Sequence, residues 1–341
     1  MEILKETFWK TKSAKIQSLA IIIVFAFMAL FIPNPNFTGS YTPLFIAWIT
    51  NYVVLSVSWN FFSGKTGYIS LASAAFYGIG MYIQAMYGRQ IPLAGVLMLS
   101  AAVSFAVGYG IGVVTLRLRG IYFTIFTFGL ALFLNMFVHW YEGLFTRTKG
   151  RMVKPYDNET IFFTMLIIFF IVLIAVLIMN RSRFGLALKC IGQNEDSAQH
   201  LGVNTTRTKV LAFAISAAPV GACGALMSTA LGYIDPDIAF RMLASFLPVL
   251  MTIFGGMGTV YGPIVGAIIF YLLENYLRQA PALNNIVLFG VLKVTALYMI
   301  IFGVIMIATV LVMPKGLFGT IESAIAKRHR KKDGEKVIGD A

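Results

Sequence analysis

The sequence predicts an all-α polytopic integral membrane protein with about ten transmembrane helices, both termini cytosolic, and one long cytosolic loop. Three observations predict this fold class. Hydrophobic residues make up 58% of the 341 residues and charged residues only 12%, which is unlike a soluble domain. Apolar runs recur at lengths near the roughly 20 residues that a bilayer core requires. Lysine and arginine fall mainly in the short segments between these runs and at the two ends.

Residues 1–16 form a basic segment that we expect to be cytosolic. Its lysines precede an apolar run at 18–32, which resembles the first two parts of a signal peptide. No cleavage site of small residues follows, and the run ends at Pro33-Asn34-Pro35. We therefore expect an uncleaved first transmembrane helix with its basic end in the cytosol.

Nine further spans are expected between this helix and the C-terminal tail. Their predicted ranges are 43–62, 68–87, 92–116, 121–141, 161–179, 210–230, 243–254, 263–276 and 295–313. The segment 281–294 is expected to be a helix on the outer surface, because Lys293 deep in lipid would cost about 2.5 to 3.5 kcal/mol. The transmembrane domain would then cover 17–319, and 320–341 would be a basic cytosolic tail.

The charge distribution orients these spans. With ten spans both ends lie on one side, and most of the 27 Lys and Arg residues then fall in the inner segments, the bias expected for cytosolic ends. The exception is the segment 147–154, which places Arg147, Lys149, Arg151 and Lys154 outside.

One polar stretch, NRSRFGLALKCIGQNEDSAQHLGVNTTRTKVLAF at 180–213, interrupts the apolar chain. Phe184, Leu188 and Ile191 share one helical face, which predicts a first short helix. The interpretation is a folded cytosolic loop that suits docking of another protein. The alternative is a solvated connector that only carries orientation charge.

A second short helix is expected to start at Asn194. Glu195 and Asp196 would favour its positive N-terminal end, His200 would lie in its last turn, and Gly202 would end it in a left-handed conformation. After it, Asn204 or Thr205 is expected to cap the helix that runs into the next span.

The predicted spans contain almost no ionisable side chain away from their ends. Transporters driven by protons or sodium usually need carboxylates, histidines or broken helices at the midplane, and a membrane enzyme needs a polar cluster. We therefore expect no catalytic residue, and a driving force from outside the membrane. Cys190 and Cys223 predict neither a disulfide nor a metal site, and the basic residues give no support for nucleic-acid binding.

Glycines gather in two stretches of the sequence. They are Gly64, Gly67, Gly78 and Gly80 in the first stretch, and Gly255, Gly256, Gly258 and Gly262 in the second. Such glycines allow close packing between membrane helices. The other interpretation is that interrupted helices line a pathway and turn freed backbone groups toward a solute.

Several motifs together resemble a known family. They are GxxGxxSL at 64–71, LRLRGIYFTIFTFG at 116–129, SRFGLALKCIGQNEDSAQHLGVNTTRTKVLAFAISA at 182–217, LGYIDP, FGGMGTVYGPIVGA and MPKGLFG. Over about 51–319 the chain resembles the branched-chain amino acid ABC permease family, on its LivM-like side. The long loop and the GGMGTVYGPIVGA piece are the specific parts of this resemblance.

The resemblance implies a permease subunit of an ATP-driven, binding-protein-dependent importer for branched-chain or other hydrophobic amino acids. The implied location is the plasma (inner) membrane of a prokaryote, among membrane lipid. The implied partners are a second, LivH-like permease, two ATP-binding cassette subunits and an extracytoplasmic solute-binding protein. ATP and Mg would bind in the partner subunits, with no cofactor in this chain.

Within this picture the loop at 180–209 becomes the coupling element, docked by a helix in a groove of the ATP-binding subunit. The residues expected to couple are Gly185, Lys189, Asn194, Glu195, Ala198, Leu201 and Gly202. Among these, Ala198 and Leu201 are expected to form the apolar docking face. The outer mouth, where the solute-binding protein would dock, is expected at Tyr233, Asp235 and Asp237 together with the 147–154 loop.

Departures from the family pattern leave alternatives open. Leu132, Asn135 and Leu247 stand where charged residues are often found in the family. A less charged pathway also suits urea, short amides or another small polar solute. A passive channel or facilitator would suit the same glycines and uncharged spans, and a membrane scaffold without a solute pathway is a further alternative. A folded inner loop favours the motor-coupled permease over a facilitator.

Overall fold

The computed structural model describes residues 42–118, 120–146, 149–279, 287–288, 292–293 and 303–304. The helices are α2 (Thr42–Thr66), α3 (Ser73–Tyr87), α4 (Leu93–Thr115), α5 (Ile121–Tyr141), η1 (Glu142–Thr146), α6 (Asn158–Arg181), α7 (Arg183–Gln193), α8 (Glu195–His200), α9 (Thr205–Leu231), α10 (Pro236–Ala239), α11 (Leu243–Gly255) and α12 (Tyr261–Gln279). The strands β1 (Arg151–Met152) and β2 (Tyr233–Ile234) pair antiparallel.

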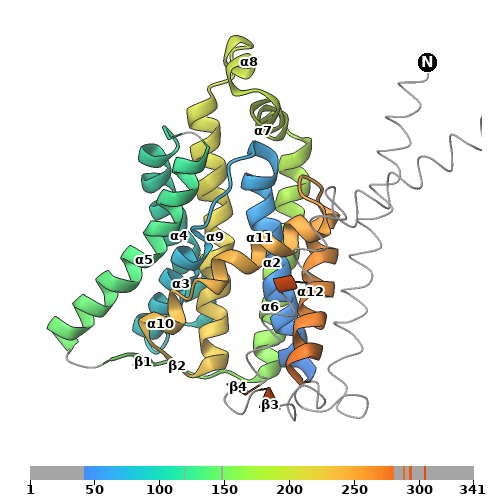
Figure 1. The fold of residues 1–341 in the computed structure, drawn as a ribbon. Coiled ribbons are helices and arrows are strands. Elements are labelled where there is room, and N and C mark those ends of the chain that lie inside the picture. The colour runs from blue at the N-terminus through green and yellow to red at the C-terminus, as the bar shows by residue number, and fades with distance from the viewer. Residues whose placement is uncertain are drawn as a thin grey trace, which may run out of the picture.

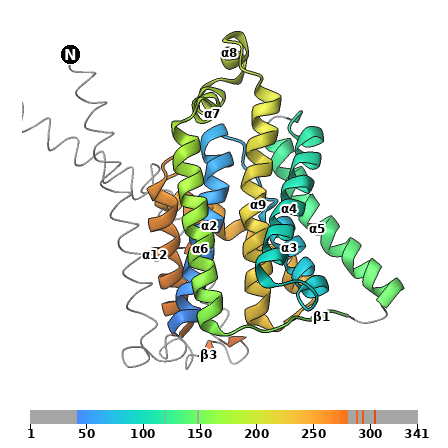
Figure 2. The ribbon, with the colours of Figure 1, turned by 180° about the vertical axis from the view of Figure 1, so that it is seen from behind.

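The long helices run between two ends of a bundle (Figures 1 and 2). One end carries α7 and α8, and we call it the α8 end. The opposite end carries β1 and β2, and we call it the β1 end. Helix α9 lies at the centre and packs most extensively on α4, α3, α2 and α6. In α2 and α9 78% of the most apolar window is buried, whereas in α5 only 17% is, so α5 is a peripheral helix that leans away from the bundle.

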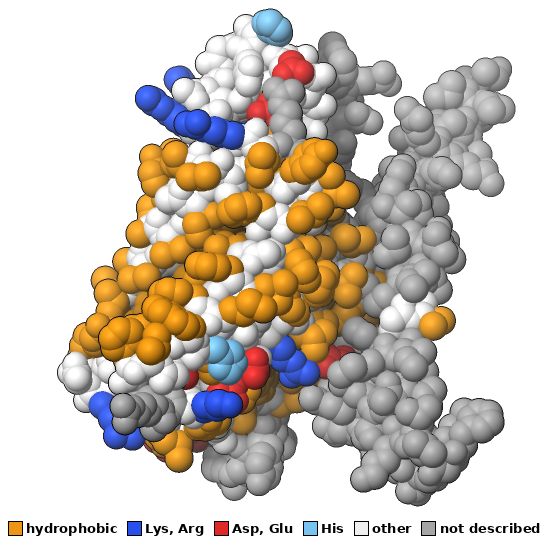
Figure 3. Space-filling view, turned by 60° about the vertical axis from the view of Figure 1, so that its left-hand side comes forward, with side chains coloured by type: hydrophobic (Ala, Val, Ile, Leu, Met, Phe, Trp, Pro, Cys, Tyr) orange, Lys and Arg blue, Asp and Glu red, His pale blue; other side chains and the backbone are white. Residues whose placement is uncertain are grey.

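Within the described residues six helices are long and apolar enough to cross a bilayer. They span Pro43–Thr66, Leu93–Thr115, Ile121–Phe145, Asn158–Arg181, Thr205–Leu231 and Pro236–Gly255. Figure 3 shows the corresponding surface, with a broad band of hydrophobic side chains between charged groups at the two ends. This layering is what a bilayer core between two aqueous faces selects. The chain is a multi-pass, all-α membrane protein.

Several predicted spans agree with the observed helices. The predicted span 121–141 coincides with α5, and 92–116 differs from α4 by one residue at each end. The predicted spans 18–32 and 295–313 lie outside the described residues, apart from Gly303 and Val304. The count of about ten spans and the cytosolic termini therefore stay predictions.

The predicted third span, 68–87, is wrong at its start. Helix α3 begins only at Ser73, and residues 67–72 are not helical. Gly67 has φ +75°, a left-handed conformation that ends the preceding helix α2 and that glycine adopts without steric cost. We call residues 67–72 the interrupted segment.

The predicted outer-surface helix at 281–294 is also wrong where the structure describes it. Val287–Leu288 and Leu292–Lys293 are the strands β3 and β4, which pair antiparallel with Val287 opposite Lys293. The rest of that segment lies outside the described residues.

An aromatic cluster joins four helices in the half of the core nearer the α8 end. The ring of Phe213 on α9 lies 5.2 Å from Phe62 on α2, 5.5 Å from Phe76 on α3 and 5.8 Å from Phe123 on α5. All four side chains are buried. Since tilted and edge-on ring pairs stabilise beyond their buried area, this cluster fixes α5 to the bundle where α5 begins.

Candidate functional site

The polar stretch between α6 and α9 folds into capped helices, as predicted from its sequence. Asn194 caps α8 by accepting a hydrogen bond from Ser197 N at 2.9 Å, and Asn204 caps α9 by accepting one from Arg207 N at 3.1 Å. Gly202 has φ +85° and follows α8. Each polar cap satisfies a backbone N–H that the first turn of a helix leaves free. The stretch is therefore a defined structure and not a loose connector.

Helix α7 is fixed to the bundle through its apolar face. Leu188 and Ile191 are buried, and Phe184 stacks on Phe61 of α2 with ring centroids 6.4 Å apart. At Gly192 a Cβ atom would overlap with the carbonyl oxygen of Lys65 at the end of α2. Such close approach tolerates only glycine. Helix α7 therefore lies directly on the end of α2.

The predicted docking face of α8 is wrong for one of its two residues. Ala198 is only 1% exposed, whereas Leu201 is 78% exposed. The cap at Asn194 and the hydrogen bond from Gln199 Nε2 to Thr205 Oγ1 (2.9 Å) orient α8 so that Ala198 faces the protein. Leu201, together with Leu186 on α7 at 63% exposure, is instead the apolar surface that α7 and α8 present to the outside.

The other predicted coupling residues differ in how exposed they are. Lys189 and Gly202 are exposed. Gly185 is buried, and a Cβ atom there would overlap with the backbone at the end of α6. Glu195 is half-buried and points back into the bundle.

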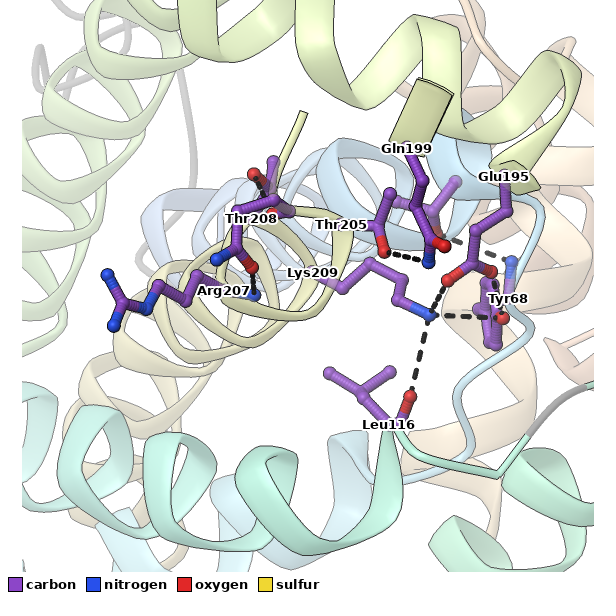
Figure 4. Close-up of polar contacts among 10 residues, drawn as sticks. Tyr68, Leu116, Glu195, Gln199, Thr205, Arg207, Thr208 and Lys209 are labelled. Carbon is purple, nitrogen blue, oxygen red and sulfur yellow. Dashed lines mark hydrogen bonds and ion pairs between the residues drawn. The ribbon is translucent and has the colours of Figure 1, made fainter. Parts of the chain in front are cut away.

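A buried ion pair connects α8 to the membrane helices (Figure 4). Lys209, in the second turn of α9, is 2% exposed. Its Nζ donates to Glu195 Oε1 of α8 at 2.5 Å, to the Tyr68 hydroxyl at 3.1 Å and to the carbonyl oxygen of Leu116 at 3.4 Å. We call Lys209, Glu195 and Tyr68 the junction.

Tyr68 closes the junction from the membrane side. Its hydroxyl donates to Glu195 Oε2 at 2.5 Å, and Lys209 Nζ also lies 4.4 Å from the centre of its ring. Hydrogen bonds that involve an ionised group are short and strong, and a cation over an aromatic face adds to them. The junction thus joins α8, the start of α9, the C-terminal end of α4 and the interrupted segment.

The sequence-based analysis missed Lys209 and Tyr68 as functional residues. The position of Lys209 could have indicated a buried partner, because a lysine at the edge of an apolar span is costly in lipid unless it is paired. Its partners, however, are 141 residues away at Tyr68 and 14 residues away at Glu195. No short-range pattern brings these three side chains together.

The interrupted segment is held by side chains of its neighbours. Ser70 O accepts from Trp59 Nε1 at 2.7 Å, Ile69 O from Thr124 Oγ1 at 2.8 Å, and Leu71 N donates to Thr127 Oγ1 at 3.0 Å. Non-helical backbone at membrane depth is tolerated only where such partners or a water-filled cavity satisfy it.

Helix α11 holds the downstream end of the same segment. Ser245 Oγ donates to Leu71 O at 2.6 Å and accepts from Ala74 N at 2.9 Å. The segment is therefore anchored to α2, α5 and α11 together.

The predicted glycines lie at close contacts between helices or in turns. A Cβ atom at Gly80 would overlap with the carbonyl of Gly221 on α9, at Gly78 with the ring of Phe240, at Gly64 with Asn60, and at Gly255 with Gly262 on α12. Gly256 and Gly258 have φ +121° and +83° and form the turn between α11 and α12. Gly258 N donates to Asn60 Oδ1 at 2.9 Å, which ties this turn to α2.

The predicted outer-mouth residues lie together at the β1 end. The Tyr233 hydroxyl donates to Lys149 O at 3.0 Å, and Asp235 caps α10 by accepting from Ile238 N at 2.7 Å. Asp237 Oδ1 accepts from Asn135 Nδ2 at 3.2 Å and lies 3.3 Å from His139 Nε2, yet its side chain is 75% exposed. Arg147 lies outside the described residues.

One cavity of the described residues has an apolar lining. A cavity of about 680 Å³ lies between α4, α6 and α9, and its lining includes Leu97, Ile167, Ile171 and Ile215. Such a lining suits lipid chains better than a polar solute. No group of three or more His, Cys, Asp or Glu side chains that could hold a metal ion occurs within the part of the chain that the structure describes.

Comparisons with known proteins identify related chains. The family model described as "Branched-chain amino acid transport system / permease component" matches residues 42–310. The chain is 25% identical over 275 residues to the high-affinity branched-chain amino acid transport system permease protein LivM of Salmonella typhimurium, with 71% of this chain and 64% of that protein covered. The chain thus spans less than two thirds of the length of this relative.

A second relative is covered almost completely. The permease protein LivH of the high-affinity branched-chain amino acid transport system of Escherichia coli is 25% identical over 299 residues, with 80% of this chain and 92% of that protein covered. Among solved structures, PsaBC from Streptococcus pneumoniae in complex with Fab matches with a TM-score of 0.44 and 12% identity, over 86% of this chain and 99% of that chain.

Proposed function

Because this chain belongs to the branched-chain amino acid transport system permease family, we propose that it is the membrane-spanning subunit of an ATP-driven, binding-protein-dependent importer. The proposed solutes are branched-chain or other hydrophobic amino acids, which the names of the relatives suggest. ATP and Mg would act in separate ATP-binding subunits, and the α8 end would face the cytosol.

The observation that carries this proposal is the folded element of α7 and α8. It is capped, packed on the ends of α2 and α6, and tied to the membrane helices by the buried junction. A facilitator needs no rigid platform at one end of its bundle, whereas a motor-coupled permease needs one to receive force. Exposed Leu186 and Leu201 give this platform the apolar contacts that docking in a groove requires.

The distribution of charge supports an external driving force. In α2, α6 and α9 the charged side chains lie in the first two or last two turns, and α4 and α5 carry no Asp, Glu, Lys or Arg. Coupling to protons or sodium usually relies on ionisable groups or broken-helix sites near the midplane. The interrupted segment does break a helix, but its backbone groups named above bond to neighbouring side chains.

Helix α5 supports the proposal of a second, LivH-like permease. Its aromatic and aliphatic side chains are exposed over most of its length, including Phe133 at 60% and Met136 at 69%. A helix that leans away from its own bundle leaves room for another subunit to pack along it. The proposed solute pathway would run between the two permeases, beside α5.

The β1 end supports docking of a solute-binding protein, with Asp237 as the favoured contact among the three residues that the sequence predicted. Tyr233 and Asp235 already make bonds that shape this end. Asp237 is exposed although His139 and Asn135 hold it in place. An exposed carboxylate with a fixed position is the better candidate for contact with a partner.

The test is transport by the complete complex in proteoliposomes. The chain is purified together with the proposed second permease, ATP-binding subunits and solute-binding protein, and labelled leucine uptake is measured with and without ATP inside the vesicles. We expect uptake only when ATP and the binding protein are both present.

Other outcomes would redirect the proposal. Leucine uptake without ATP would identify a facilitator. ATP-dependent uptake of urea or a short amide, with none of leucine, would keep the motor-coupled mechanism and change the solute. Absence of any ATP-dependent uptake would contradict the proposed function.

A further inference from the structure

We propose that the junction of Lys209, Glu195 and Tyr68 is a rigid joint that carries movement of α8 to the interrupted segment and from there to α3, α5 and α11. These three residues would position the membrane helices and would not contact the solute. The inference rests on the proposed function, because it requires a motor that moves α8. It adds the route by which that movement reaches the helices.

The first step is the direct contact between α8 and the membrane helices. Glu195 is the first residue of α8, and both of its carboxylate oxygens are engaged, Oε1 by Lys209 and Oε2 by Tyr68. A carboxylate held through two oxygens by two partners has little freedom to rotate. A displacement of α8 therefore has to move Lys209 and Tyr68 with it or break strong bonds in a buried site.

The second step is that the backbone turn between α8 and α9 is a more flexible connection than the junction. Between α8 and α9 lie Leu201 to Asn204, with Gly202 in a left-handed conformation. A short turn around a glycine can absorb a displacement by changing its backbone angles. The hydrogen bond from Gln199 to Thr205 joins neutral side chains and is weaker than a charged, buried bond. The junction is thus the stiff route.

The third step is the short path from Tyr68 to the ends of three helices. Tyr68 lies one residue after Gly67, where α2 has ended, and five residues before α3 starts. Leu71, three residues further on, bonds to Thr127 of α5 and to Ser245 of α11. Since Ile69 O, Leu71 N and Leu71 O are hydrogen-bonded to side chains of α5 and α11, a shift at Tyr68 is transmitted to these two helices.

The fourth step is the burial of the charge. Lys209 is 2% exposed and its partner Glu195 is 15% exposed in the side chain. A buried ion pair contributes little net stability compared with apolar packing, and its best-attested use is to fix one arrangement among several. The junction connects α8 to the interrupted segment. An ion pair that fixes one arrangement there suits a rigid connection between the two.

The test uses Tyr68→Phe, which removes one hydroxyl and keeps the aromatic ring beneath Lys209. The ion pair between Lys209 and Glu195 remains, so α8 keeps its anchor to α9. The matched control is Tyr109→Phe on α4, whose side chain is half-exposed. Both variants are purified in the complete complex, and ATP hydrolysis and leucine uptake are measured on the same vesicles.

We expect Tyr68→Phe to keep ATP hydrolysis while uptake per ATP hydrolysed falls by about ten-fold, and Tyr109→Phe to match the wild type in both. A merely structural role would lower hydrolysis and uptake together. If Tyr68→Phe fails to assemble, Ser245→Ala at the other end of the segment is judged by the same ratio. Uptake per ATP within about two-fold of the wild type overturns the joint.

The same experiment separates the joint from the function on which it rests. If the wild-type complex shows no ATP-dependent uptake, the proposed function fails and the joint fails with it. If the wild type transports and the variant that assembles keeps its ratio, only the joint is overturned.

Discussion

Lys209 shows how one buried charge fixes the relation between two parts of the protein. Its Nζ group bonds to α8, to the interrupted segment and to the end of α4. We expect Lys209→Met to lower the free energy of unfolding by about 3 kcal/mol, because Glu195 loses its charged partner in a buried site. Thermal unfolding of the detergent-solubilised protein measures this change.

Two controls make the Lys209→Met prediction specific. Lys189→Met on α7 removes an exposed lysine and should leave the melting temperature close to that of the wild type. The double variant Lys209→Met/Glu195→Gln should recover part of the loss, since no unpaired charge stays buried. An unchanged melting temperature for Lys209→Met alone would contradict the description of the junction.

Gly80 lies at a close contact between two helices in the middle of the bundle. A Cβ atom there would overlap with the carbonyl of Gly221, while a Cβ atom at Gly129 of α5 would meet no atom within 4 Å. We expect Gly80→Ala to destabilise the protein by about 1 to 3 kcal/mol, since α3 and α9 would have to separate. Gly129→Ala is the control and should be neutral or slightly stabilising. Equal melting temperatures for the two variants would argue against close packing at Gly80.

At the scale of elements, only one of the two docking residues that the sequence pattern favoured, Leu201, is exposed at the end of α8. Ala198 is buried, so Ala198→Arg would disturb α8 itself and could not report on docking alone. Leu201 is exposed, so Leu201→Arg should leave insertion and the melting temperature intact. We expect it to reduce co-purification of the ATP-binding subunits by about ten-fold, as loss of an exposed apolar anchor at an interface does.

The comparison variant for Leu201→Arg is Thr206→Arg on the first turn of α9, which is also exposed. It adds the same charge near α8 without removing an apolar contact. If both variants weaken co-purification equally, charge repulsion and not the lost contact of Leu201 is the cause. Full co-purification with Leu201→Arg would remove α8 from the proposed interface.

At the scale of the whole molecule, the two ends of the bundle define a test of orientation. Ser197 lies on α8, and Asn158 begins α6 at the β1 end. With Cys190 and Cys223 replaced, a single cysteine at Ser197 should react only from the cytosol, and one at Asn158 only from outside. The readout is labelling by a membrane-impermeant maleimide in intact cells and in inverted vesicles.

The labelling result also tests the orientation that we predict for the spans outside the described residues. An opposite assignment of both positions would invert the proposed topology and remove the α8 end from the cytosol. Labelling of both from one face would contradict the bundle itself, since α6 spans the distance between its two ends (Figure 2).

The sequence by itself determined the membrane class, most helix boundaries and the family. Apolar length and loop charge act locally, so α4, α5, α6, α9 and α11 could be placed within a few residues. The caps at Asn194 and Asn204 and the left-handed Gly202 were equally predictable, because a cap depends on residues within one turn of it.

Only the tertiary structure decided what the polar stretch contacts. The burial of Ala198, the late start of α3 at Ser73 and the junction of Tyr68 with Glu195 and Lys209 depend on groups that are far apart along the chain. A non-helical segment inside a membrane bundle is stable only when distant side chains such as Thr127 and Ser245 satisfy its backbone. Periodicity reports which face of a helix is apolar. It does not report whether that face meets lipid, a partner subunit or the same chain.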